Sequence, residues 1–552
     1  MKRVAADAET FDHVVVGSGS AGAALAARLS EDPARRVLLL EAGEDDGWIW
    51  LRIPSGLIYV VRGDRAIWRF QTEPDAVMKG RRIFWPRGRV LGGSSGINGM
   101  IWVHGDPREY DRWRDEFGAQ GWGWDALAPM FRAIEAYPRG DARVRGHDGP
   151  VRITEYGPRQ PLMDAFVEAC VQAGIPRTDD YNDGRYEGVG MLQLNTDRGL
   201  RCSTREAYLK PARGRPNLVV RTGAFAHRVL FEGRRAVGVE YVQGDARRVA
   251  RSRSDVVLCA GAIQSPQLLE LSGVGDPAVL AAQGIPLVHA LPAVGTNLRD
   301  HPHTRLSYEA RNVASLNTLY PSLLGKARMA ARFAWSRDGL MSGCGQIAHA
   351  LVRTDPTDPQ PDVKIQLHWL SSPDARDPRR YVLDPHPGVS VGTFMLRPRS
   401  TGSVHVCSPD PAAHPRIVSN YFTDPADRRA ALAAMRLARA VVAQPALAGF
   451  IVRELRPGPE ADTDEALFDF ATSSAQTSYH PIGTCRMGGD AASVVDARLR
   501  VRGVEGLRVA DASVMPTMPS SNTNAPAIVI GEKAARMIVE DARATGAIEV
   551  RG

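Results

Sequence analysis

A glycine-rich turn near the N-terminus places the strongest constraint on how this chain folds. Residues 14–43, VVVGSGSAGAALAARLSEDPARRVLLLEAG, begin with a β-rich run that leads directly into Gly17, Gly19 and Gly22. An Ala/Leu-rich stretch with apolar residues at helical spacing follows, and then the fully apolar run 37–40. Strand, turn, helix and strand in this order predict a βαβ unit with a parallel pair of strands.

The spacing G-x-G-x-x-G gives each glycine a separate task in binding a dinucleotide. The first allows a tight turn, the second lets the backbone approach a pyrophosphate, and the third lets the helix pack on the strand. The helix N-terminus then offers free N–H groups and the positive end of its dipole to the phosphates. Glu41, at the end of the second strand, is placed to hold the ribose hydroxyls. This acid disfavours the 2′-phosphate of NADP and leaves NAD and FAD as alternatives.

A second glycine-rich loop favours the larger of these two cofactors. Residues 88–105, GRVLGGSSGINGMIWVHG, combine Arg89, a Gly-Gly turn, two serines and Asn98. Such a loop is too rich in glycine for regular structure and brings many backbone N–H donors close together. A simple nicotinamide dehydrogenase has no need of it, whereas a flavin has ring carbonyls and N5 to satisfy with hydrogen bonds.

The rest of the chain alternates between two kinds of pattern. A nucleotide-type α/β pattern opens the chain and returns at its end, while the stretch from about 310 to 460 is Pro-rich and carries alternating runs typical of a sheet. The expected elements are a helix at 122–134, an antiparallel pair within 216–242, a strand at 255–260 followed by a helix that ends at Gly273, a helix at 427–442, and a strand and a long helix after 500.

Size and composition narrow the class of protein. A chain of 552 residues predicts about two to four folding units. The net charge of +7 is dilute and no Lys/Arg block carries interleaved aromatic residues, which favours a solvated basic surface over a nucleic-acid site. The six cysteines are scattered without a CxxC pair, so we expect no metal site and no disulfide framework, but reduced thiols in a cytoplasmic protein. Residues 1–9 lack the apolar core of a signal peptide, and no run of about 18 apolar residues predicts a membrane span.

Five motifs, in order along nearly the whole chain, point to one flavoenzyme family. They are GSGSAG with Glu41, the 88–105 loop, GAIQSPQLLELSGVG (261–275), VGTNLRDHP (294–302), and YHPIGTCRMG (479–488) with LRVADASVMPTMPSSNTNAPAIVIGEKAA (507–535). On these motifs the chain resembles the glucose–methanol–choline (GMC) family of FAD-dependent alcohol oxidoreductases.

The resemblance implies which residues surround the cofactor. The residues that it implies at the ADP half of FAD are Gly17, Gly19, Gly22 and Glu41. Those that it implies along the cofactor toward the isoalloxazine are Trp68, Arg89, Val90, Gly93, Asn98, Gly99 and Met100. It also implies Val229 at the adenine through its backbone, Asp511 and Ala512 near the ribityl chain and the pyrophosphate, and the segment 522–526 near the flavin ring. Some members link FAD through a histidine whose position here is Ile97, so we expect non-covalent FAD.

Alcohol oxidation needs a base as well as a hydride acceptor. Flavin N5 takes the hydride, and the protein supplies a group of near-neutral pKa for the hydroxyl proton. A lone histidine is more often structural, but within YHPIGTCRMG the resemblance makes His480 the expected base, and Pro481 restricts it to extended backbone. The family's second active-site position, His or Asn, falls on Asn522, whose amide orients the substrate oxygen but cannot take its proton. Asn524 is a rival for this role, and helix N-capping is the alternative role of both.

Neighbouring residues in these motifs receive weaker interpretations. Tyr479 either lines the pocket or only packs, and Cys485 is expected to be a small packed residue. Asp300 and His301 look like a second acid–base pair, but the family uses this segment structurally, so we assign them no catalytic role.

These observations predict an α/β protein with a Rossmann-like FAD-binding domain and a substrate domain on a mostly antiparallel sheet with helices. The FAD-binding domain is expected to be discontinuous, over 1–155, 200–305 and 465–552, and the substrate domain to cover 156–199 and 306–464. The expected reaction is oxidation of a primary alcohol to an aldehyde, with reoxidation by O₂ or an electron carrier.

Three alternatives stay open. They are a choline or alcohol dehydrogenase that uses a quinone-type acceptor, a hydroxynitrile lyase that keeps FAD as structure, and an NAD-dependent reductase. Aryl or furanic alcohols, aliphatic alcohols and choline are all candidate substrates, and the sequence leaves the choice among them and the oligomeric state open.

Overall fold

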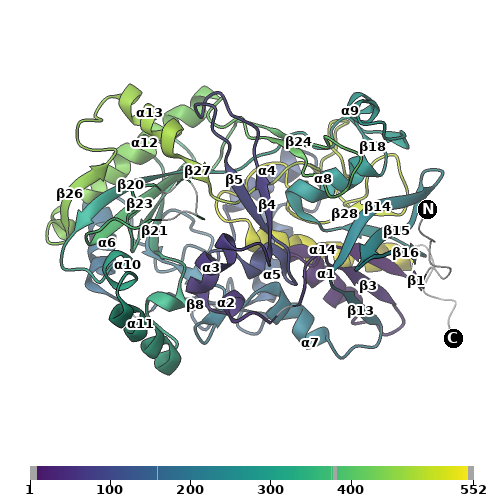
Figure 1. Ribbon diagram of the computed structural model, residues 1–552, viewed down its shortest axis with the longest axis horizontal. Coiled ribbons are helices and arrows are strands. Elements are labelled where there is room, and N and C mark those ends of the chain that lie inside the picture. Colours follow the sequence, from purple (N-terminus) through teal and green to yellow (C-terminus); the bar gives the residue numbers. More distant parts are fainter. Residues whose placement is uncertain are drawn as a thin grey trace.

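The computed structural model describes residues 9–544, apart from positions 46, 158, 375, 377, 378, 380 and 381. The signal-peptide interpretation of residues 1–9 therefore lies almost entirely outside the described part. Two main sheets organise the chain, a parallel one at the right of Figure 1 and an antiparallel one at its left. The predicted mixture of α and β structure is confirmed.

The parallel sheet carries the glycine turn. Its order is β13-β3-β2-β17-β28, from β2 (His13–Val16), β3 (Val37–Leu40), β13 (Leu218–Arg221), β17 (Val256–Leu258) and β28 (Leu507–Val509). All four pairings are parallel, and the central strands are runs of buried valine and leucine. Parallel strands covered on both faces require such continuous apolar runs. The strand order reverses between β2 and β17, so the turns that follow these two strands lie side by side.

Helices from both ends of the chain pack together beside this sheet. α1 (Ser20–Leu29) follows the glycine turn and packs along α14 (Asn524–Ala544), which also contacts α5 (Trp124–Ile134). A Cβ at Gly531 would lie 2.2 Å from the carbonyl oxygen of Ala21, so only glycine allows α1 and α14 to approach this closely. The C-terminal segment is thereby joined to the N-terminal one.

The prediction that the two alternating runs within 216–242 pair with each other is wrong. The first run forms β13, which joins the edge of the parallel sheet beside β3. The second run forms β15 (Arg235–Gln243), whose antiparallel partners are β14 (Ala224–Glu232) and β16 (Ala246–Ser252). Alternation of apolar residues identifies a strand, but the choice of partner depends on long-range packing that no local pattern contains.

The second sheet is antiparallel, as its alternating sequence predicts. Its order β26-β20-β23-β22-β21-β9 uses β9 (Gly188–Met191), β20 (Pro302–Ala310), β21 (Gln346–Val352), β22 (Val363–His368), β23 (Gly388–Met395) and β26 (Ile451–Arg456), and β27 (Gln476–Thr477) pairs with β20. α12 (Pro425–Val442) and α6 (Pro161–Gln172) pack on it. Since β20 begins at Pro302, this strand crosses the expected domain boundary after residue 305.

The remaining helices and strands complete the fold. They are β1 (Glu9–Phe11), α2 (Ile49–Arg52), α3 (Leu57–Arg62), β4 (Ile67–Gln71), β5 (Phe84–Gly88), α4 (Pro107–Asp115), β6 (Glu135–Ala136), β7 (Val151–Arg152), β8 (Thr154–Glu155), β10 (Gln193–Leu194), β11 (Thr196–Asp197), β12 (Leu200–Arg201), α7 (Lys210–Ala212), α8 (Gly261–Leu271), β18 (Val274–Gly275), α9 (Pro277–Ala282), β19 (His289–Ala290), α10 (Leu316–Leu319), α11 (Leu323–Ser336), β24 (Ser403–His405), β25 (Arg416–Val418) and α13 (Asp464–Ser474). Within the described ranges, no helix has both the length and the apolar composition that crossing a membrane requires.

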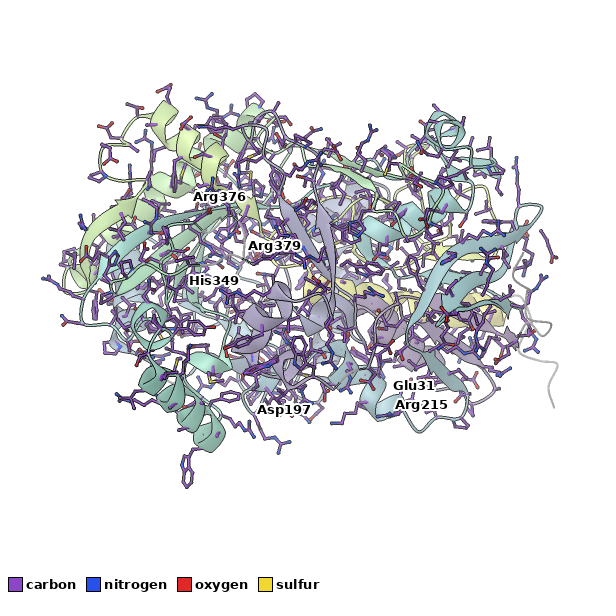
Figure 2. The ribbon with its side chains drawn as sticks, viewed as in Figure 1. Glu31, Asp197, Arg215, His349, Arg376 and Arg379 are labelled. Atoms are coloured by element: carbon purple, nitrogen blue, oxygen red, sulfur yellow. The ribbon has the colours of Figure 1, made fainter. Side chains whose placement is uncertain are left out.

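His349 on β21 is expected to destabilise the protein (Figure 2). Its side chain is fully buried against the ring of Tyr181, 4.3 Å away, and neither ring nitrogen has a hydrogen-bond partner among the described residues. Replacing His349 with leucine should raise the free energy of unfolding by about 1–3 kcal/mol, because two unsatisfied polar atoms leave the core. Urea unfolding of parent and variant measures this difference.

The gain from His349→Leu should grow at acid pH. Burial, together with the charge of Lys364, holds the pKa of His349 well below 6.5. As pH falls below about 6.5, the unfolded chain therefore binds a proton that the folded protein does not, and the parent loses stability that the variant keeps. His147→Leu, at an exposed position, is the control and should show no such pH-dependent gain. A His349→Leu variant less stable than the parent at both pH values would contradict this account.

Candidate functional site

A cavity of about 630 Å³ is lined by residues of both the parallel and the antiparallel sheet. The expected site residues that line it are Gly17, Gly19, Glu41, Trp68, Gly93, Asn98, Gly99, Met100, His480, Asp511, Ala512 and Asn522. The expected site residues outside its lining are Gly22, Arg89, Val90 and Val229. Residues more than 400 positions apart in the sequence thus face one space.

The glycine turn lies at the carboxyl ends of β2 and β17, where the strand order reverses. Gly17 has a φ of +98°, and a Cβ there would lie 2.5 Å from the carbonyl oxygen of Cys259. A Cβ at Gly22 would lie 2.0 Å from the carbonyl oxygen of Gly17, so Gly22 serves helix packing and not the cavity. A Cβ at Gly19 would meet nothing within 4 Å, because this residue opens onto the cavity. This is the arrangement in which a phosphate reaches backbone N–H groups.

Glu41 ties the second strand to the glycine turn. Its Oε2 accepts hydrogen bonds from the backbone N–H and the hydroxyl of Ser18, at 3.0 and 2.6 Å, and its Oε1 accepts one from the N–H of Gly43 at 2.8 Å. Burial raises the pKa of Glu41, and these three donors oppose that rise. A carboxylate oxygen accepts more than one hydrogen bond, so Glu41 retains capacity for a hydroxyl in the cavity.

The 88–105 loop packs directly on the glycine turn. Gly93 has a φ of +52°, and a Cβ there would lie 2.7 Å from the Cα of Gly19. Asn98 is fixed by Arg201, whose Nη1 donates to the backbone oxygen and to Oδ1 of Asn98 at 2.7 and 2.8 Å. Ile97 lines the cavity in this loop. The loop thus forms one wall along the path from Gly19 toward His480.

Three of the expected cofactor residues, Arg89, Val90 and Val229, lie outside the lining of the cavity. The guanidinium of Arg89 stacks on the ring of Trp68, 4.8 Å from its centre, and Trp68 itself lines the cavity. Val90 is buried in an apolar cluster with Ile97. Val229 is buried and donates its N–H to the hydroxyl of Ser272 at 2.8 Å.

The C-terminal motif contributes Asp511, Ala512, Asn522 and Asn524 to the lining of the cavity. The Oδ2 of Asp511 accepts hydrogen bonds from the N–H of Gly261 at 2.8 Å and the hydroxyl of Ser265 at 2.6 Å. Asp511 thereby fixes the start of α8 next to the glycine turn. Asn524 begins α14, and its Oδ1 accepts a hydrogen bond from the hydroxyl of Ser20 at 2.7 Å. Asn524 therefore joins α14 to α1 and does not contact His480.

The backbone at His480 is held from two sides. Its N–H donates to Oδ1 of Asp300 at 2.8 Å, while Arg87 donates to the carbonyl oxygen of Tyr479 at 2.8 Å. Tyr479 has a φ of +66° and its N–H donates to the hydroxyl of Thr477. Tyr479 lines the cavity, whereas Cys485 is fully buried outside it.

A chain of hydrogen bonds defines which nitrogen of His480 carries the proton. Nε2 of His301 lies 3.0 Å from the carbonyl oxygen of Leu396, which only accepts, so this nitrogen carries a hydrogen. Burial lowers the pKa of His301 to about 4, so its ring is neutral and its Nδ1 is an acceptor. Nδ1 of His480 lies 2.9 Å from that atom and must therefore donate. The neutral His480 ring is left with a lone pair on Nε2.

Asn522 contacts this lone pair. Its Nδ2 lies 3.0 Å from Nε2 of His480. Its Oδ1 accepts from Nζ of Lys364 at 3.0 Å, with the hydroxyl of Ser521 at 3.1 Å. Because Nζ of Lys364 and the hydroxyl of Ser521 both donate to Oδ1, the amide is oriented with its oxygen toward the lysine and its N–H groups toward His480.

The surroundings keep the His480 ring neutral. Burial lowers its pKa well below 6.5, and the neighbouring His301, Lys364, Arg87 and His303 lower it further. Burial also lowers the pKa of Lys364 to about 7. A neutral imidazole with an unprotonated Nε2 can accept a proton at neutral pH. The arrangement can therefore take a proton from a hydroxyl group.

Sequence analysis missed one group that contacts the site and gave two others no catalytic role. Those two are Asp300 and His301, and the structure shows that both form hydrogen bonds to His480. Their adjacency in the motif 294–302 was their signal in the sequence. Lys364 gave no signal, since one lysine in an alternating run is normally solvated. Nowhere in the described ranges do three or more metal-ligating side chains form a group that would hold a metal ion.

Comparisons with known proteins show which family the chain is similar to. A family model described as GMC oxidoreductase matches residues 11–303, and a second GMC oxidoreductase model matches 398–531. The chain is 42% identical over 536 residues to the oxygen-dependent choline dehydrogenase of Escherichia coli (strain K12), covering 96% of this chain and 95% of the relative.

Solved structures of other oxidases have a similar fold. The pyridoxine 4-oxidase from Mesorbium loti superposes with a TM-score of 0.87 at 34% identity, covering 96% of this chain and 99% of that one. A formate oxidase from Aspergillus oryzae RIB40, whose structure concerns FAD modification, superposes with a TM-score of 0.89 at 25% identity, covering 98% of this chain and 100% of that one.

Proposed function

The chain belongs to the GMC oxidoreductase family and is an FAD-dependent alcohol oxidoreductase, and we propose that it oxidises a primary alcohol to an aldehyde with His480 as the base. The observation that carries this proposal is the unprotonated Nε2 of His480, which accepts a hydrogen bond from Nδ2 of Asn522 at 3.0 Å, both residues lining the cavity. A hydroxyl group placed there meets an acceptor for its proton and a donor for its oxygen.

The residues of the cavity fit FAD. We assign the ADP half to Gly17, Gly19 and Glu41 and the flavin half to the 93–100 loop and Asn522. The fit rests on Gly19 and Gly261, where a Cβ would meet nothing within 4 Å, so the backbone is bare along the wall between the two halves. Val90 and Val229 lie outside the lining, and the family resemblance alone supports their proposed place at the cofactor.

The two sheets suggest a division of labour. We assign the parallel sheet with its glycine turn to a Rossmann-like FAD-binding domain, because dinucleotides bind where the strand order reverses. We assign the antiparallel sheet to the substrate domain, because His303 and Arg305 on β20 and His368 on β22 line the same cavity as His480.

The chain's own residues then act as follows. Bound FAD supplies the acceptor for the hydride of the carbinol carbon. Nε2 of His480 takes the hydroxyl proton, and the N–H of Asn522 holds the oxygen on which negative charge develops. Burial makes an isolated imidazolium unfavourable, so His480 keeps this proton only beside that developing charge. His301 and Lys364 hold the ring and the amide in the required orientation.

Choline is a second candidate substrate. The relative with 42% identity carries choline dehydrogenase in its name, and the similarity covers nearly the whole of both chains.

FAD is expected to leave the protein on denaturation. Ile97 stands at the position that carries the linking histidine in covalent members, and its side chain cannot bond to the flavin. Acid precipitation of the purified protein should therefore release all yellow colour into the supernatant. A pellet that stays yellow after washing would show a covalent link through another residue.

Anaerobic titration with alcohols tests the proposed function. The visible flavin band should bleach when benzyl alcohol, hydroxymethylfurfural, hexanol or choline is added, because the alcohol is the electron donor. Rapid return of the band in air identifies an oxidase, and a band that stays bleached until a quinone is added identifies a dehydrogenase. A yellow protein that no alcohol bleaches would contradict alcohol oxidation and favour a lyase that keeps FAD as structure.

A further inference from the structure

The most exposed apolar side chains of the protein are gathered on one helix. Ten large apolar side chains are exposed among the described residues, and the three most exposed are Leu323 at 83%, Leu324 at 70% and Trp335 at 93%. All three belong to α11, which projects at the lower left of the molecule in Figure 1. Scattered exposed apolar residues are ordinary, but a group of them on one element marks an interaction surface.

α11 is attached to the rest of the protein along one side. Of its 14 residues, only Gly325 and Phe333 are buried. A Cβ at Gly325 would lie 2.2 Å from the carbonyl oxygen of Leu319, so the helix packs against the backbone of α10 at this point. The hydroxyl of Ser322 accepts from the N–H of Gly325 at 3.2 Å and caps the first turn. The opposite side of the helix faces solvent.

This solvent-facing side is apolar along its length. Leu324, Ala327, Ala331 and Trp335 follow one another at steps of three or four residues, which places them on one face of the helix, and all four are exposed. A surface helix normally turns its apolar face toward the core, whereas α11 turns it outward. We call the following exposed residues the outer face: Leu323, Leu324, Ala327, Ala331, Ala334 and Trp335.

The charges that border the outer face are positive. Helical spacing places Lys326 on one side of it and Arg328 and Arg332 on the other, and Arg337 follows the last turn. Residues 312–337 contain no aspartate or glutamate. Asp338, which accepts from Arg332 at 2.8 Å, offsets one of these four charges. The surface around the outer face therefore suits an anionic partner.

The cavity opens next to the same helix. Lys326, Met329 and Ala330 line the cavity from α11, and Tyr59 lines it from α3. Since Tyr59, Lys326 and Ala330 are also exposed, the mouth of the cavity lies between these two helices. The hydroxyls of Tyr59 and Tyr320 lie 3.4 Å apart at this place. A partner bound to the outer face would therefore lie beside the mouth.

We propose that α11 docks on the surface of an anionic lipid bilayer, with its outer face among the lipids and the mouth of the cavity beside them. Helices that lie in a membrane surface combine exposed leucine and tryptophan with Lys or Arg on their polar side. The long stem of a lysine or arginine lets its charge reach the headgroups while the apolar face is buried. A tryptophan ring suits this boundary because its body is apolar and its N–H can stay hydrated.

A second copy of the chain is the alternative occupant of the outer face. A symmetric contact through α11 would bring Lys326, Arg328 and Arg337 of one copy toward the same cations of the other, because both copies use the same surface. An anionic bilayer instead offers opposite charge to each of them. The inference does not depend on alcohol oxidation, because it concerns a surface outside the site of the reaction.

Vesicle binding tests the inference. The purified flavoprotein should sediment with phosphatidylglycerol vesicles and should bind phosphatidylcholine vesicles at least about tenfold more weakly, because several cations act together near an anionic surface. Added salt should weaken the binding to phosphatidylglycerol, since it screens these charges. Absence of sedimentation with phosphatidylglycerol would overturn the proposal and leave α11 to a protein partner. Equal binding to both lipids would overturn it as well.

Variants assign the binding to α11. Trp335→Ser and Leu324→Ser should each weaken binding to phosphatidylglycerol vesicles about tenfold, because each removes a large apolar side chain from the lipid. Arg328→Gln should weaken it about fivefold. The control is Leu287→Ser, at an exposed position between α9 and β19, and it should bind as the parent does. Binding at the parent's strength by all three α11 variants would overturn the proposal.

Two further measurements on Trp335→Ser separate the remaining outcomes. Light scattering should give the same mass for this variant and the parent, whatever their number of subunits. A parent assembly that Trp335→Ser dissociates would show that the outer face binds a second copy, which would overturn the proposal. Alcohols should reduce the flavin of the variant at the parent's rate in vesicle-free solution, because Trp335 does not line the cavity. Vesicle binding without any reduction by alcohols would contradict the proposed function and leave the docking surface in place.

Discussion

Replacing His480 with alanine is expected to leave a yellow protein whose flavin is reduced by alcohols about 10²- to 10⁴-fold more slowly, the usual contribution of a general base. Nε2 of His480 is the ring nitrogen that the hydrogen-bond chain through His301 leaves unprotonated. Asn522 cannot replace it, because an amide does not accept a proton at neutral pH. Stopped-flow absorbance under anaerobic conditions gives the rate of reduction directly.

The pH dependence of the same reaction gives a second test of His480. A base acts when it is unprotonated, and burial lowers the pKa of His480 well below 6.5. The rate of flavin reduction by the parent should therefore stay level as pH falls through about 6.5 and decline only at more acid pH. His147→Ala, at an exposed position, should match the parent. Reduction by His480→Ala at the parent's rate would remove His480 as the base.

The parts of the site that lie within one motif could be predicted from the sequence. The glycine turn with its strands and Glu41 is local, so the spacing of Gly17, Gly19 and Gly22 was enough to place it at the end of β2. His480 and Asn522 came from the resemblance, and the structure puts their side chains 3.0 Å apart. In each case a short sequence motif was enough to identify the residues of the site.

Contacts between distant segments could not be predicted in this way. Lys364 orients Asn522 from a strand 158 positions earlier, and His301 contacts His480 across 179 positions. The predicted partner of β13 was wrong for the same reason, because its apolar run could pair with any of several strands. These contacts depend on which strands pair in the folded chain. A single sequence indicates where strands lie but not which strands pair.

Replacing His301 with leucine is expected to slow flavin reduction by about 10²-fold or more, although His301 itself does not line the cavity. His301 is a positioning residue: its Nδ1 accepts the hydrogen on Nδ1 of His480, and its own tautomer is fixed by the carbonyl of Leu396. Without this acceptor the proton of His480 is free to move to Nε2. A ring protonated at Nε2 has no lone pair for the hydroxyl proton, so catalysis falls while the ring stays in place.

His301→Asn is the matched variant, because the asparagine oxygen stands near the place of Nδ1 and still accepts a hydrogen bond. It should recover most of the rate that His301→Leu loses. A loss through altered packing would instead lower the FAD content and the unfolding temperature of both variants and would weaken alcohol binding. The predicted pattern is a lower limiting rate of reduction with little change in the concentration of alcohol that half-saturates it. Equal rates for the leucine and asparagine variants would show that the tautomer of His480 is set by something other than His301.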